Sequence, residues 1–200
     1  MGEAAADDPV FTLRDLNPQK GDAELGDNFI INLKNIVVDF DGGAKERTLT
    51  LDFPLYNDLY ELYIGIKEGS ILGDAPEYKI TVPIVYYGSS ITQGGCASRP
   101  GMSYQAIVER RFDANYINLG FSGNGKGEDT MAEYIAGLDM SVFVYDYDHN
   151  APTPEFLQAT HKPFFDRIRE ANPNLPIIMK PNAGMPRSEN GKTVYDVEAE

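Results

Sequence analysis

The chain is poor in the residues that cross-link proteins or bind metals most often, because its 200 residues include one cysteine and two histidines. It also lacks tryptophan. A single cysteine, Cys96, excludes a disulfide within the chain, so cysteine usage does not indicate the compartment. Cys96 lies six residues after Ser90. We interpret it as a small buried loop residue and not as a nucleophile.

Positive charge is also scarce, with 17 Lys and Arg against 31 Asp and Glu, a net charge of −14. Such a chain repels nucleic acids and anionic membranes, so we expect neither as a partner. No apolar run approaches the roughly 20 residues that span a bilayer, and the first eight residues lack the features of a signal peptide. We expect a soluble protein, either cytosolic or periplasmic or secreted after removal of a signal. The sequence gives no oligomeric state.

The first 80 residues contain short runs of β-favouring residues with no helical pattern between them. The runs cover 29–33, 36–40, 48–53 and 59–66, and Gly, Asp, Asn or Pro bounds each one. This pattern predicts a small antiparallel β-sandwich domain, jelly-roll-like, over residues 1–80. One alternative is a non-catalytic protein in which Tyr56, Tyr60 and Tyr63 of this half bind carbohydrate and the second half is inert.

From residue 81 onward, predicted strands alternate with predicted helices. We expect strands at 82–87, 115–119, 141–147 and 176–180, and helices near 102–113, 128–137 and 154–171. A series of this kind forms a parallel sheet, which predicts an α/β domain over 81–200. Ligands of such sheets bind at the carboxyl ends of the strands. The loops that follow the first three strands are therefore the candidate site.

Each of these three loops offers one group that acyl transfer through serine requires. Ser90 follows the first strand and supplies a hydroxyl. The loop after the second strand is rich in glycine, so Gly123 can expose its backbone N–H. Asn150 follows the third strand and can direct its amide inward. A hydroxyl nucleophile and N–H donors for the oxyanion are the core of a serine esterase site.

These residues resemble a known family in order and spacing. Ser90 in Gly88-Ser-Ser-Ile-Thr, Gly123 in Asn118-Leu-Gly-Phe-Ser-Gly and Asn150 in Asp148-His-Asn are similar to the first three sequence blocks of the SGNH (GDSL-like) esterases and acylhydrolases. The resemblance covers roughly residues 82–179 and implies a flavodoxin-like three-layer αβα sheet. It implies that Ser90 is the nucleophile, and that its own N–H, the Gly123 N–H and the Asn150 amide form the oxyanion hole.

The longer strings 87–101 and 146–152 resemble a bacterial subgroup that carries an N-terminal β-domain, and 57–60 is similar to a short motif of that domain. Ser89 stands where the aspartate that names the family usually stands. Some relatives with this layout are carbohydrate esterases, so the implied substrate is a small-molecule or glycan ester, with deacetylation of a sugar as one case. The resemblance implies neither a metal nor an organic cofactor.

The catalytic base of that family is a histidine in a late Asp-x-x-His block, and the chain contains no such block. Its two histidines are His149, whose side chain we expect to face away from the site, and His161, which we interpret as a solvated helix histidine. We therefore expect the chain to be a fragment, with a hydrolase domain incomplete at its C-terminus and the acid and base beyond Glu200.

A phosphate-binding loop is the strongest alternative. Gly120-x-x-x-x-Gly125-Lys126 follows an apolar strand and precedes a helix, as in a nucleotide hydrolase. The next residue, Gly127, lacks the hydroxyl that such loops offer to Mg²⁺. This interpretation also leaves the other two strand-end loops unexplained.

Aspartyl-phosphate chemistry is a second alternative, because Asp146 and Asp148, like Asp39 and Asp41, form Asp-x-Asp after apolar runs. No further phosphatase pattern follows either pair. We do not expect Asp146, Asp148 and His149 to bind a metal together, since alternate residues of an extended chain point to opposite sides.

Overall fold

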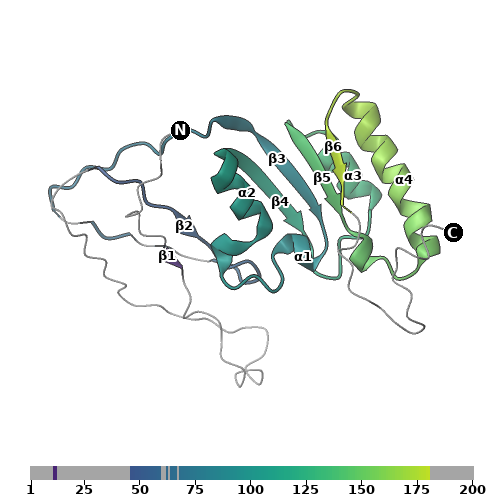
Figure 1. The fold of residues 1–200 in the computed structure, drawn as a ribbon, viewed down its shortest axis with the longest axis horizontal. Coiled ribbons are helices and arrows are strands. Elements are labelled where there is room, and N and C mark those ends of the chain that lie inside the picture. Colours follow the sequence, from purple (N-terminus) through teal and green to yellow (C-terminus); the bar gives the residue numbers. More distant parts are fainter. Residues whose placement is uncertain (1–10, 13–45, 60–61, 63, 67, 181–200) are drawn as a thin grey trace, which may run out of the picture. The chain divides into compact units, whose positions relative to one another are not determined.

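The computed structural model describes residues 11–12, 46–59, 62, 64–66 and 68–180 of the chain (Figure 1). Contacts divide the chain into two compact units. The first contains residues up to Pro76 together with Arg99–Gly101, and the second contains Glu77–Ser98 and the residues from Met102 onward. The candidate site belongs to the second unit.

The first unit contains one described strand pairing, between β1 (Phe11–Thr12) and β2 (Leu51–Asp52). This pairing is parallel, whereas the sequence predicted antiparallel strands. The predicted strands 29–33 and 36–40 lie outside the described residues, so the β-sandwich over 1–80 stays a prediction. The strand predicted at 59–66 is wrong for the described residues of that range. The described apolar side chains Leu59, Leu62, Ile64 and Ile66 are 44–57% exposed, so they lack the cover that a half-buried strand gives its apolar residues.

The second unit is built on a parallel four-stranded sheet in the order β4-β3-β5-β6 (Figure 1). All four strands confirm the sequence prediction, with every boundary within two residues of the predicted one. They are β3 (Ile80–Gly88), β4 (Ala114–Gly120), β5 (Val142–Asp146) and β6 (Ile177–Met179).

Three longer helices connect the strands and confirm the predicted ranges: α2 (Tyr104–Phe112), α3 (Asp129–Ala136) and α4 (Pro154–Ala171). The short helices are α1 (Ser90–Gln93) and the 3-10 turns η3 (Pro100–Met102) and η4 (Asp148–Asn150). The sequence did not predict α1, because one turn is too short to produce a helical period. Its ends are nonetheless well defined: the Ser89 side chain caps the first turn, and Gly94 ends it in the left-handed conformation at φ 112°.

Alternation along β3 explains why helices cover both faces of the sheet. Tyr87 packs against Phe164 of α4, with ring centroids 4.8 Å apart, while its neighbour Tyr86 contacts Tyr104 of α2 at 5.6 Å. Successive side chains of a strand point to opposite faces, so α2 and α4 lie on opposite sides of the sheet. This arrangement confirms the three-layer αβα fold. The main core lies on the α3 and α4 side and is rich in aromatic rings.

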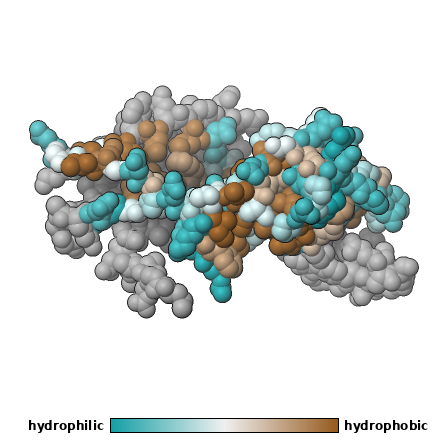
Figure 2. All heavy atoms as spheres, turned by 90° about the horizontal axis from the view of Figure 1, so that it is seen from above, coloured by the Kyte–Doolittle hydropathy of each residue, from teal (hydrophilic) through white to brown (hydrophobic). Residues whose placement is uncertain are grey.

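Apolar side chains also reach the surface of the described residues, and Figure 2 shows them interspersed with hydrophilic ones on the face seen from above. On the edge strand β6, Ile178 and Met179 are 54% and 48% exposed, whereas Phe143 and Tyr145 of the neighbouring β5 are buried. An edge strand has one sheet neighbour, so its side chains are less covered. No helix among the described residues combines the length and the apolar character that crossing a membrane requires.

Candidate active site

Strand register brings the three candidate loops to one edge of the sheet. Gly88, the last residue of β3, pairs with Gly120 of β4 on one side and with Asp146 of β5 on the other. The chain passes from β3 to its neighbour β4 and then crosses to β5 on the opposite side. Such a switch in direction opens a crevice at the carboxyl ends of the strands. The loops after β3 and β5 flank this position.

The turn between β3 and α1 packs against the end of β5 without space for a side chain at Gly88. A Cβ on Gly88 would overlap the backbone carbonyl oxygen of Asp146 and the Oγ1 of Thr92. The Ser89 N–H donates to the same Asp146 carbonyl at 2.9 Å. Glycine at position 88 therefore allows the turn that carries Ser90 to lie directly on β5.

The loop after β4 is held against the same turn by two further glycines. A Cβ on Gly120 would overlap the backbone of Gln93, and a Cβ on Gly125 would lie 2.5 Å from the carbonyl oxygen of Gly88. The Phe121 N–H donates to that Gly88 carbonyl at 2.9 Å. Gly120 and Gly125 thus allow the backbone to pack closely beside the serine turn.

The two adjacent serines occupy different environments. Ser89 is fully buried, and its Oγ accepts a hydrogen bond from the Ile91 N–H at 3.2 Å, which caps α1. Ser90 is the first residue of α1 and is partly exposed. Of the pair, Ser90 is therefore the one that a substrate could reach.

The backbone N–H groups of residues 121–125 are satisfied within the protein with one exception. Phe121 donates to Gly88, Ser122 donates to Gln93 Oε1 at 2.8 Å, and both Asn124 and Gly125 donate to the Phe121 carbonyl at 3.1 Å. The Gly123 N–H has no hydrogen-bond partner within the described part of the chain. Gly123 has φ +70°, and a Cβ there would meet nothing within 4 Å. Its N–H is thus left for a ligand.

Asn150 joins the third loop to the second. Its Nδ2 donates to the carbonyl oxygen of Phe121 at 3.0 Å and to that of Gly125 at 2.9 Å. Two carbonyl oxygens can be satisfied only by the NH₂ end of the amide, so these contacts fix its orientation. Both amide hydrogens are engaged, and the Phe121 oxygen accepts three hydrogen bonds in total.

A buried carboxylate lies directly beneath the serine turn. Asp146 accepts hydrogen bonds from Thr92 Oγ1 at 3.1 Å and from Lys180 Nζ at 2.7 Å, and its side chain is 0% exposed. Burial raises the pKa of Asp146 above its ordinary value, while the Lys180 ammonium counteracts that rise. The sequence did not indicate a role for Thr92 or Lys180. Lys180 follows the last strand without a motif that could have marked it.

The sequence prediction for His161 is wrong, whereas the orientation expected for His149 stays a prediction. His161 is not a solvated helix residue, because its ring lies tilted against Tyr145 at 4.4 Å and stacked on Tyr147 at 5.8 Å, and burial lowers its pKa. The aromatic end of β5 lies under this part of α4, which the helical pattern alone does not show. The Nε2 of His149 is buried and has no hydrogen-bond partner in the described structure, while its backbone N–H donates to Asp148 Oδ1.

The interpretation of Cys96 as a buried residue is wrong, since it is exposed at a left-handed position with φ 65°. The loop there turns outward after α1 ends at Gly94.

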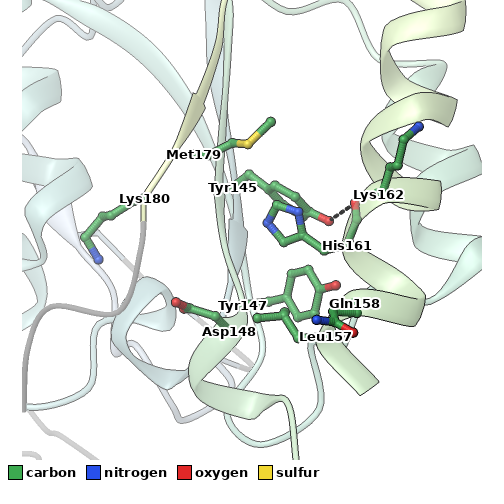
Figure 3. Close-up of a pocket in the computed structure, with 9 residues that line it drawn as sticks. All are labelled: Tyr145, Tyr147, Asp148, Leu157, Gln158, His161, Lys162, Met179 and Lys180. Atoms are coloured by element: carbon green, nitrogen blue, oxygen red, sulfur yellow. Dashed lines mark hydrogen bonds between the residues drawn. The ribbon is translucent and has the colours of Figure 1, made fainter. Parts of the chain in front are cut away.

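A pocket of about 630 Å³ lies between β5, β6 and the first half of α4 (Figure 3). Figure 3 shows the His161 ring beside Tyr145, with the Lys162 side chain pointing away from both. The lining residues are Tyr145, Tyr147, Asp148, Leu157, Gln158, His161, Lys162, Met179 and Lys180. Through Asp148 and Lys180 the pocket adjoins the third loop and the buried carboxylate.

The phosphate-loop alternative does not hold for residues 120–126. Such a loop directs several backbone N–H groups at one anion, but here four of the five N–H groups at 121–125 donate within the protein. The Lys126 N–H likewise donates to Glu128 Oε1. Among the described residues, no three of His, Cys, Asp or Glu are grouped so that they could hold a metal ion.

A three-layer α/β fold with a reachable serine and an unpaired N–H at neighbouring strand ends defines the class of site. Residues 81–193, more than half of the chain, match the model of the GDSL-like lipase/acylhydrolase family, and the protein belongs to this family. No curated protein matches the chain.

Two solved structures are similar to part of the chain. A Bacteroides ovatus ATCC 8483 protein described as a GDSL-like lipase is 43% identical, with a TM-score of 0.49, over 54% of this chain and 31% of that one. A salicylyl-acyltransferase from a tetracycline biosynthetic pathway is 22% identical, with a TM-score of 0.44, over 52% of this chain and 30% of the other. The matched part spans about a third of the length of these proteins.

Proposed function

We propose that the protein hydrolyses carboxylic esters, with Ser90 as the nucleophile and the N–H groups of Ser90 and Gly123 as oxyanion donors. The main support for this proposal comes from the backbone N–H groups of residues 121–125. All of them except that of Gly123 donate hydrogen bonds within the described structure. An oxyanion hole needs a donor of this kind, fixed in place and free until charge develops on the substrate.

In the reaction, Ser90 Oγ attacks the ester carbonyl carbon as its proton passes to a general base. The carbonyl π electrons move to oxygen, and the resulting oxyanion accepts hydrogen bonds from the proposed donors. Collapse of this tetrahedral species breaks the bond to the alcohol, which leaves with a proton. Water then hydrolyses the acyl-serine by the same steps and releases the carboxylic acid.

Asn150 is the third proposed oxyanion donor, and the structure suggests how it could act. Its bond to the Phe121 carbonyl can be exchanged for a bond to the oxyanion, because that carbonyl keeps two other hydrogen bonds, from Asn124 and Gly125. The Gly125 carbonyl has its bond from Asn150, which would remain and hold the amide in place. We therefore propose that one N–H of the Asn150 amide exchanges its hydrogen bond to the Phe121 carbonyl for a hydrogen bond to the oxyanion when the substrate reacts.

We do not assign the base to either histidine of the chain. The His161 ring packs against Tyr145 and Tyr147, and the His149 Nε2 is buried without a partner in the described residues. The proposed substrate is a small-molecule or glycan ester, with O-acetylated carbohydrate as the first class to test.

The test compares two single substitutions in the whole natural protein. Ser90→Ala should abolish hydrolysis of aryl acetates and acetylated sugars, and a fluorophosphonate should no longer add to the protein as measured by mass. Ser89→Ala should keep the adduct and most of the turnover, and should lose about 0.5–2 kcal/mol of stability with the cap on α1. Full hydrolysis by the Ser90 variant would refute the proposed function, and equal loss in both variants would mean that the wrong serine was chosen.

A further inference from the structure

The side chain of Gln93 connects the helix of the proposed nucleophile to the loop of the proposed oxyanion donor. Gln93 is the last residue of α1, which begins at Ser90. Its Oε1 accepts a hydrogen bond from the Ser122 N–H at 2.8 Å, and Ser122 directly precedes Gly123. This hydrogen bond therefore joins the segment that begins at Ser90 to the residue before Gly123.

The peptide unit between Ser122 and Gly123 carries the N–H that the proposed mechanism uses. Its carbonyl oxygen, on Ser122, accepts a hydrogen bond from Asn124 Nδ2 at 3.2 Å. The C=O and N–H of a trans peptide point in opposite directions in one plane, so fixing the carbonyl also sets the direction of the Gly123 N–H. Gln93 fixes the preceding N–H, and together the two side chains hold both ends of Ser122.

This restraint matters because Gly123 itself supplies none. Glycine at φ +70° has other backbone conformations within easy reach, and a Cβ there would contact nothing within 4 Å. Residues 121–124 are exposed, so packing does not immobilise them either. Rotation of the peptide unit would turn the Gly123 N–H away from the oxyanion.

The position of Gln93 is itself well fixed. Its backbone N–H donates to the Ser89 carbonyl at 3.0 Å within α1, and its backbone lies against Gly120 so closely that a Cβ on that glycine would overlap it. The side chain therefore starts from a rigid point between the serine turn and the end of β4.

We propose that Gln93 is a positioning residue that orients the Gly123 N–H relative to Ser90 and so presets the oxyanion hole before substrate binds. This inference rests on the proposed function and adds a specific residue to it. Gln93 orients the Gly123 N–H but does not itself donate to the oxyanion. Removing its side-chain acceptor should therefore lower turnover by less than the 10²-fold to 10³-fold that the loss of an oxyanion donor causes. We expect about a tenfold loss of turnover, which corresponds to one modest hydrogen bond.

The test uses Gln93→Met, which keeps the length of the side chain and removes the acceptor, in the whole natural protein. We expect kcat to fall about tenfold while KM stays within about twofold. The affinity of a boronic acid that forms a tetrahedral adduct with Ser90 should fall by a similar factor, and a fluorophosphonate should still label every active site at completion. Glu170→Met, at an exposed position near the end of α4 and outside the pocket lining, is the control and should leave kcat unchanged.

Two results would overturn the proposal: a kcat of Gln93→Met within twofold of the parent, or a fall in kcat matched by a loss of labelled sites, which would indicate unfolding. Ser90→Ala separates the two levels of inference. If Ser90→Ala remains active, the proposed function itself fails. If Ser90→Ala is inactive and Gln93→Met behaves like the parent, only the positioning role fails.

Discussion

The close contact between Gly120 and α1 predicts how much a side chain at position 120 would lower stability and activity. In Gly120→Ala, the new Cβ would lie 2.5 Å from the carbonyl carbon of Thr92 and 2.6 Å from Gln93 Cα, and nearer still to Gln93 N. All three are backbone atoms, so no side-chain rotation can relieve the overlap. Ordinary carbon contacts lie at about 3.5–4.0 Å, and α1 must therefore move by roughly 1 Å from the end of β4.

Overpacking of this kind costs about 1–3 kcal/mol, and for a chain of this size each kcal/mol lowers Tm by roughly 2–4 °C. Activity should fall much more, on the order of 10²-fold, because a shift of about 1 Å misplaces Ser90 relative to Gly123. Thermal unfolding and ester hydrolysis measure the two effects. Gly137→Ala is the control, since a Cβ there meets its nearest atom at 3.6 Å and φ is an ordinary −87°. If both variants were equally stable and active, the packing argument would be refuted.

Two further predictions concern buried ionisable groups. Lys180→Met removes the ammonium 2.7 Å from the fully buried Asp146 and should lower the free energy of unfolding, measured in urea, by about 2 kcal/mol or more. Lys162→Met, which breaks an exposed pair with Asp166, should lower it by under about 1 kcal/mol. Equal effects would mean that Asp146 needs no partner. Burial lowers the pKa of His161 below its ordinary 6.5, so the unfolded chain binds more protons and stability should decline as pH falls through 6.5. In His161→Phe, which keeps a ring on Tyr145, Tm should depend less on pH over this range; an unchanged dependence would contradict the assignment.

The sheet and its longer helices could be predicted because their patterns are strong and local. The runs at β3 and β5 are buried, as strands in the middle of a parallel sheet are, and α4 begins at a Thr153 cap followed by Pro154. The segment 59–66 has equally apolar residues, yet its described part is not strand. Residue type alone does not say whether a partner strand exists, which is why this prediction failed.

The candidate site was predictable to the level of loops, because parallel strands end at a common edge. Ser90, Gly123 and Asn150 follow three strands whose last residues are in register. The sequence did not reveal that the Asn150 amide donates both hydrogens to loop carbonyls. Nor did it place His161 against Tyr145, because that contact depends on how α4 packs across β5.

The role proposed for Gln93 illustrates why such residues escape sequence analysis. Thr92-Gln-Gly looks like an ordinary turn, and glutamine carries no catalytic signature of its own. Its contact with Ser122 exists because Gly88 pairs with Gly120, which sets α1 beside the first residues of the next loop. A slip of one residue in that register would turn every side chain of the strand to the other face. The geometry that we propose to orient the oxyanion donor is therefore a property of strand pairing, and it becomes visible only when the pairing is known.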